Sequence, residues 1–115
     1  MHDDLLTLSD RITLLIDTRE SASSATLLAE MEHTLTDGYA RALELEGERW
    51  RLEKQIGELT ARIAEGDEVI DLRDLVARLG EADRELGRLR GLLAALRRRV
   101  DTVRAATASA AAASG

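Results

Sequence analysis

The chain has 115 residues, a formal net charge of −6 at pH 7, no Cys, Pro or Phe, and a single Trp and a single Tyr. The lack of Cys excludes disulfides and thiolate metal sites, and the scarcity of aromatic rings argues against a broad globular core. The abundance of Ala, Glu, Leu and Arg is instead typical of long helices that pack in narrow layers.

Residues 1–20 are predicted to form a short N-terminal amphipathic helix. Leu5, Leu8, Ile12 and Leu15 recur at intervals of three and four, which places them on one helical stripe. The small polar stretch SASSA at 21–25 predicts a loop, in which Ser24 can cap the helix that follows.

A seven-residue apolar repeat begins at Leu28 and keeps its frame over six heptads. Its two core positions are called here the first and second core rows. The first row holds Leu28, Leu35, Ala42, Arg49, Ile56 and Ile63, and the second holds Met31, Gly38, Leu45, Leu52, Leu59 and Gly66. This frame predicts one coiled-coil-like helix over about 24–65. The sequence TDG at 36–38 would also suit a turn, but the unchanged frame on both sides favours a continuous helix with a weak point at Gly38.

Gly66 and Asp67 predict the end of that helix and the start of another. A second repeat follows, and its rows hold Leu72, Leu79, Leu86, Leu93 and Val100, and Leu75, Ala82, Leu89, Leu96 and Val103. It predicts a helix over about 69–104. Two long helices joined by a few residues fold back antiparallel. The predicted fold is therefore all-α: a long antiparallel, coiled-coil-like helical hairpin over 21–104, followed by a disordered Ala-rich tail at 105–115.

Several large apolar residues lie beside the core rows, where a two-helix hairpin would leave them in water. They form the predicted interaction face: Tyr39, Leu43, Trp50, Val76 and Leu92. Apolar faces of this width are typical of helical bundles. We therefore expect a homodimer with a four-helix core, while docking of the N-terminal helix or of another protein on this face remains an alternative.

Arg49 is the only charged residue in the core rows of the first long helix. Its stem can lie along apolar neighbours while its head reaches Glu46, Glu53 or Asp83. Because a polar residue in such a row can fix register and partner at a cost in stability, Arg49 is the predicted register and specificity residue.

Residues 84–104 contain seven Arg against only Glu85 and Asp101. The predicted basic patch comprises Arg84, Arg88, Arg90, Arg97, Arg98 and Arg99. Folding the hairpin is expected to bring the last three near the acids Glu30, Glu32 and Asp37, so that the patch serves mainly internal charge matching. Nucleic acid is not an expected partner, because the chain is acidic overall and no aromatic or Gly-rich nucleic-acid motif accompanies the arginines.

No residue pattern in the sequence is typical of catalysis. His2 and His33 are the only histidines, and neither has a partner at metal-ligand spacing. The chain contains neither a Gly-rich phosphate loop nor a nucleophile elbow. We therefore expect no enzymatic activity, no cofactor and no metal.

One spacing of polar residues is similar to a known motif. Two-helix anti-sigma factors that bind cyclic di-GMP carry Glu, Ser, Arg, Gln and Asp at gaps of 4, 3, 4 and 4. At the same gaps this chain carries Glu44, Glu48, Arg51, Gln55 and Leu59. The resemblance covers 16 residues and three of the five types. Glu48 would repel a phosphate and Leu59 belongs to a core row, so the chain is not assigned to that family.

The expected function is a non-enzymatic coiled-coil protein–protein interaction module, serving as an adaptor, scaffold or protein-binding regulator. The alternative is a transcription-linked regulator that binds a sigma factor, nucleic acid or a nucleotide through its hairpin. No apolar run approaches the roughly 20 residues of a membrane span, and the acidic start MHDD is unlike a signal peptide, so we expect a cytoplasmic location. Arg outnumbers Lys by 15 to 1, which is typical of a GC-rich bacterial genome.

Overall fold

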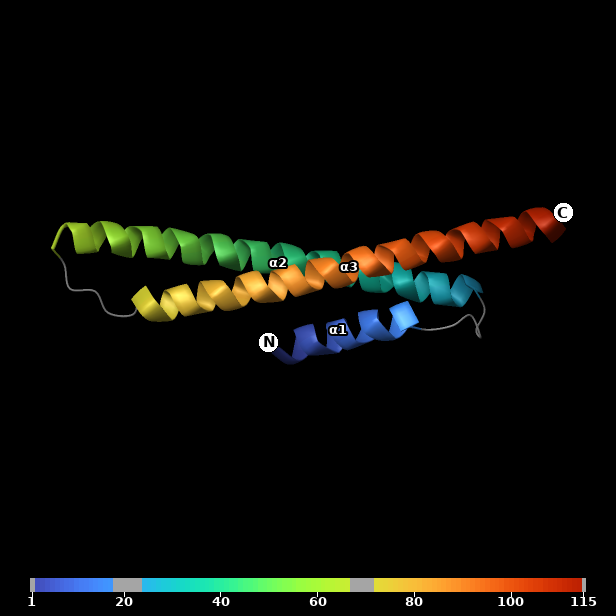
Figure 1. Cartoon of the computed structure of the whole chain (residues 1–115), viewed down its shortest axis with the longest axis horizontal. Helices are drawn as coiled ribbons and strands as arrows, with labels where there is room; N and C mark the ends of the chain where they lie inside the picture. The colour runs from blue at the N-terminus through green and yellow to red at the C-terminus, as the bar shows by residue number, and fades with distance from the viewer. Residues whose placement is uncertain (1, 18–23, 67–71, 115) are drawn as a thin grey trace. The chain divides into compact units, whose positions relative to one another are not determined.

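A computed structural model describes residues 2–17, 24–66 and 72–114. These residues form three α-helices: α1 (His2–Asp17), α2 (Ser24–Ala64) and α3 (Leu72–Ser114) (Figure 1). The described residues include no strand. Helices α2 and α3 pack along one another, so the all-α fold with a long helical hairpin is confirmed.

The helix boundaries differ from the expected ones mainly at the end of α3. This helix continues to Ser114, whereas the Ala-rich segment 105–115 was expected to be disordered. Side chains 105–112 are exposed, so tertiary packing does not hold this segment helical. Ala has the highest helix propensity of all residues, which is sufficient to extend a helix that is already formed. At the other end of the hairpin, Gly66 has a φ of +92°, as predicted for a helix-ending Gly; residues 67–71 lie outside the described residues.

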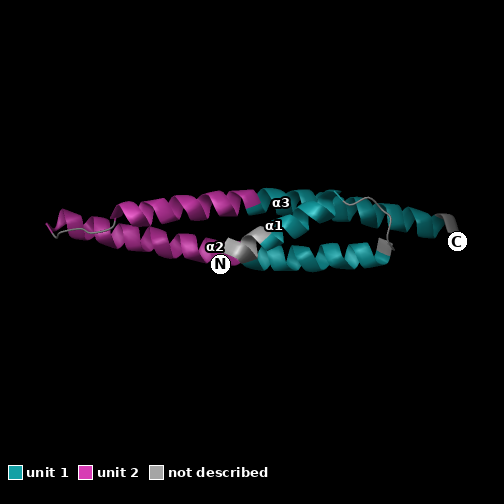
Figure 2. Cartoon of the chain, turned by 90° about the horizontal axis from the view of Figure 1, so that it is seen from below, with its two compact units in different colours: residues 1–41, 89–115 teal, residues 42–88 magenta. Residues whose placement is uncertain are grey.

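The chain divides into two compact units, which are coloured separately in Figure 2. Unit 1 comprises residues 1–41 and 89–115, and unit 2 comprises residues 42–88. Unit 1 therefore contains α1 together with the first part of α2 and the second part of α3. Unit 2 contains only the remaining parts of α2 and α3.

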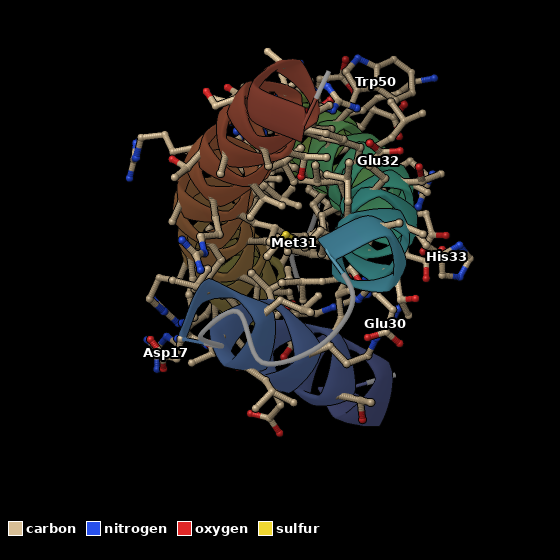
Figure 3. All side chains as sticks on the ribbon, turned by 90° about the vertical axis from the view of Figure 1, so that its right-hand side faces the viewer. Asp17, Glu30, Met31, Glu32, His33 and Trp50 are labelled. Carbon is tan, nitrogen blue, oxygen red and sulfur yellow. The ribbon has the colours of Figure 1, made fainter. Side chains whose placement is uncertain are left out.

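Unit 1 is a three-helix bundle around a buried apolar core. Met31 of α2 is fully buried and points into the space between the three helices (Figure 3). The stripe predicted on the first helix faces this core, because Leu8, Ile12 and Leu15 are all buried. The other buried apolar side chains of the core are Leu27, Leu35, Leu89, Leu93, Leu96, Val100 and Val103, and the polar Thr34 is buried with them. Each helix thus supplies one apolar stripe, and the three stripes meet.

Unit 2 has a thinner core, because two helices can bury little more than the seam between them. Leu45, Leu52 and Leu86 are buried there. Toward the turn of the hairpin the core rows become only half-buried, at Ile56, Leu59, Leu72, Leu75 and Leu79.

Helix α2 runs without a break through residues 36–38. Gly38 is buried, and a Cβ atom placed there would lie well inside the van der Waals distance of Leu93 Cδ2 and 3.4 Å from Leu93 Cγ. The glycine therefore admits a leucine side chain of α3 against the backbone of α2. Counting core layers outward from the predicted turn at Asp67 would place Gly38 near Leu96, whereas in the structure Leu93 lies against Gly38.

The acids of α2 in unit 1 have different partners from those expected. Asp37 forms an ion pair with Arg11 of α1 at 3.3 Å, and Glu32 pairs with Arg104 of α3. Within α3, Arg97 lies 3.7 Å from Asp101, one turn away. Arg97 thus pairs within its own helix, while Asp37 and Glu32 have partners in α1 and near the end of α3 that the sequence analysis did not predict.

Candidate interaction surface

The most exposed large apolar side chains of unit 2 are Leu43, Trp50 and Val76. Their exposed fractions are 70%, 61% and 52%. Leu43 and Trp50 lie seven residues apart on α2, which is two helical turns, and Trp50 points away from its helix (Figure 3). The Lys54 ammonium stands over the Trp50 ring at 5.4 Å from its centroid, which covers one face of the indole with a cation. These three residues are called here the apolar stripe.

All three residues of the apolar stripe border the same side of the unit 2 hairpin. Arg49 marks this side, because its guanidinium reaches Asp83 of α3 at 3.5 Å and Glu53 of α2 at 3.9 Å. Residues seven apart share a helix face, so Val76 lies on the same face of α3 as Asp83. Trp50 is one turn from Glu53 and shares its side of α2. The stripe thus includes residues from both helices.

The other two residues of the predicted interaction face lie in unit 1. Tyr39 is exposed there and Leu92 is half-buried. Leu14 of α1 is also exposed, with an exposed fraction of 67%. The sequence analysis did not single out this leucine. In the sequence, the exposure of Leu14 is indicated only by its position outside the stripe formed by Leu8, Ile12 and Leu15.

Arg49 lies in a core row of α2 but is only half-buried, and its guanidinium group lies at the edge of the seam between α2 and α3. Its side chain is 36% exposed, and two of the three acids predicted as its partners lie within 4 Å. Because the pair with Asp83 joins α2 to α3, it favours one register of the two helices. Its role in specificity stays a prediction.

Replacing Arg49 by Leu is expected to raise the free energy of unfolding by about 1 kcal/mol. Exposed ion pairs contribute roughly 0.2–1 kcal/mol, whereas a fully buried Leu contributes about 1.5–3 kcal/mol, and this site is only partly covered. Chemical denaturation followed by circular dichroism measures the change. Arg51→Leu is the matched control, because Arg51 is exposed outside the core rows and should give no gain. A clear loss of stability in Arg49→Leu would contradict the interpretation.

The basic patch does not form one face of α3. Successive helical residues are 100° apart, so Arg97, Arg98 and Arg99 point in three directions. Arg84, Arg88, Arg90, Arg97 and Arg98 are exposed, while Arg99 is half-buried. A helix that binds a phosphate backbone presents its cations on one side. By the same rotation, Arg90 and Arg97 lie on a different side of α3 from the other four arginines of the patch.

Among the described residues, no group of three or more His, Asp or Glu could hold a metal ion. His33 is exposed and lies 3.6 Å from Asp37. Of the residues that resemble the cyclic di-GMP motif, Glu44, Arg51 and Gln55 are exposed, while Glu48 and Leu59 are half-buried.

No family model, curated protein or solved structure matches this chain. Of the helices in the described part of the chain, none is long and apolar enough to cross a membrane.

Proposed function

We propose that this chain is a helical-hairpin protein–protein interaction module that acts by binding rather than by catalysis and that self-associates as a homodimer through unit 2. The observation that supports the proposal is the apolar stripe, in which Leu43, Trp50 and Val76 are each more than half exposed. Fully burying one such side chain is worth about 1.5–3 kcal/mol, so three per chain favour association.

The difference between the two units supports unit 2 as the site of assembly. In unit 1 a third helix packs on the core, and Met31 and Ile12 are fully buried. Unit 2 consists of two helices, and Ile56 and Leu79 in its core rows are only half-buried. Two such hairpins that pack together form a four-helix core, which is a common arrangement for antiparallel helix pairs.

The double substitution Leu43→Lys and Trp50→Ala is expected to weaken self-association by at least tenfold. It removes two of the three large apolar side chains of the stripe and places a charge in the proposed interface. Sedimentation at protein concentrations from about 1 to about 100 µM would measure the monomer–dimer equilibrium. Leu14→Lys is the matched control, because it removes an exposed leucine of unit 1 and should leave the equilibrium unchanged.

A dimer also gains apparent stability with concentration by mass action. The unfolding midpoint of the native chain should therefore rise across that range, and that of the double variant should not. A native chain that sediments as a monomer throughout, with a constant midpoint, would refute the proposed dimer.

A further inference from the structure

Unit 2 has an open groove between α2 and α3, separate from the apolar stripe. Its volume is about 450 Å³, and Leu59 and Leu75 of the core rows line it. The polar residues of its lining are Gln55, Glu58, Arg62, Asp74 and Arg78. Trp50 and Gln55 are five residues apart, which turns their side chains about 140° from one another around α2. A molecule in the groove would therefore contact a different side of α2 from one on the stripe.

The docking of α1 in unit 1 shows how this protein holds a third helix against its hairpin. Arg11 of α1 donates hydrogen bonds to Thr34 Oγ1 at 3.2 Å and to Asp37 Oδ2 at 3.3 Å. Beside this contact, Ile12 and Leu15 of α1 are buried. The recognition pattern on α2 is thus a polar acceptor followed three residues later by a carboxylate, at the edge of an apolar seam.

The same pattern recurs in the open groove. Gln55 lies 21 residues after Thr34, and Glu58 lies 21 residues after Asp37. Because 21 residues are three heptads and the frame of α2 does not slip, the two pairs occupy the same positions relative to the core rows. The amide oxygen of Gln55 and the carboxylate of Glu58 are acceptors for a guanidinium. Here, however, the seam residues Leu59 and Leu75 remain half-exposed.

We propose that this groove binds an amphipathic helix of a partner protein with the chemistry of α1. Such a helix carries apolar residues at positions i, i+4 and i+7 and an Arg at i+3, as Leu8, Ile12, Leu15 and Arg11 do. The apolar side chains cover Leu59 and Leu75, and the Arg binds Glu58 and Gln55.

The occupant is a partner helix rather than α1 of a second copy. The α1 of each copy is docked in its own unit 1 and is joined to α2 by only six residues. A short linker gives an effective concentration in the millimolar range. A second copy would have to give up its own docked α1 to fill the groove, whereas a partner helix would not.

The test uses a synthetic peptide of residues 2–17 as the probe and the full-length chain labelled with ¹⁵N. Because tethered α1 occupies unit 1, the added peptide is expected to shift the backbone amides of residues 55–59 and 75–78. A peptide with Arg11→Glu should bind about threefold to tenfold more weakly. Glu58→Arg in the chain should weaken binding of the native peptide by a similar factor and restore binding of the Arg11→Glu peptide. Glu44→Arg, which lies two heptads earlier at the same heptad position, is the control and should change neither affinity.

Four results of the peptide experiment would overturn the proposal. They are the absence of any shift, shifts confined to residues 34–38 of unit 1, shifts centred on Leu43 and Trp50, and equal effects of Glu58→Arg and Glu44→Arg. The same experiment without peptide uses the Leu43→Lys and Trp50→Ala variant, whose self-association through the apolar stripe is weakened. Concentration-dependent shifts of residues 55–59 in that variant would identify a second copy as the occupant of the groove and would also overturn the proposal. The proposed dimer is tested independently, since Glu58→Arg should leave sedimentation of the chain alone unchanged.

Discussion

Replacing Gly38 by Leu is expected to lower the free energy of unfolding by about 3 kcal/mol. A Cβ at this position already lies too close to the Leu93 side chain, and a larger side chain would have to displace a leucine that is itself buried. Overpacking a well-filled core typically costs 1–3 kcal/mol and occasionally more. Chemical denaturation followed by circular dichroism measures the loss. The smaller change Gly38→Ala should cost less, because only a methyl group enters the space of Leu93 and the gain in helix propensity, about 1 kcal/mol, offsets part of the strain.

Gly91→Leu is the matched control for this prediction. Gly91 lies on α3 in the same unit, and a Cβ there would meet no atom within 4 Å. The substitution should stabilise the chain by about 0.5–1 kcal/mol through helix propensity alone. A second check is the pair Gly38→Ala with Leu93→Ala, whose combined effect should be smaller than the sum of the two single effects, because removing the leucine relieves the clash. Equal losses in Gly38→Leu and Gly91→Leu would show that Leu93 does not set the constraint.

The hairpin could be predicted from the sequence because its signal is repeated many times. Most heptads place two apolar residues on the seam. A single exception, such as Arg49 or Gly38, therefore does not shift the frame of the repeat. The left-handed Gly66 was predicted for the same kind of reason, since few residues tolerate a positive φ. Both features depend on local backbone geometry and on the period of the apolar residues, which can be determined from the amino-acid sequence.

The partners of individual side chains could not be predicted in the same way. The choice of Arg11 as the partner of Asp37 depends on where α1 docks, and a single amphipathic stripe on a short helix is compatible with several docking sites. The choice of Leu93 rather than Leu96 opposite Gly38 depends on a shift of one turn between two helices. Counting residues from a turn of unknown length leaves such a shift open.

The candidate surfaces were predictable in part. Leu43, Trp50 and Val76 stood out because they are large apolar residues outside the core rows, and the structure leaves all three exposed. The groove beside Leu59 and Leu75 was not foreseen, since both residues belong to the core rows and were expected to be covered. Their half-burial follows from the number of helices in unit 2, which the heptad pattern does not specify.

Ile12→Asp is expected to detach α1 from unit 1 and to lower the free energy of unfolding by about 3 kcal/mol or more. Ile12 is fully buried, so the substitution places an ionised carboxylate in an apolar core, where its desolvation is not compensated. A helix of 16 residues is marginal in water without tertiary contacts. The undocked α1 should therefore unfold, and the ion pair between Arg11 and Asp37 should be lost with it.

Amide hydrogen exchange separates this local effect from general unfolding. In Ile12→Asp, the amides of α1 should exchange at nearly the rate of an unfolded chain, while those around Leu45 and Leu86 in unit 2 should keep their protection, since stability is distributed unevenly over a structure. Leu14→Asp is the matched control on the same helix: its side chain is 67% exposed, and surface substitutions usually change stability by less than about 0.5 kcal/mol. If α1 stayed protected in Ile12→Asp, burial of Ile12 would not be what holds α1 in place. If protection were lost in both variants, α1 would be held too weakly to serve as the template for a partner helix in unit 2.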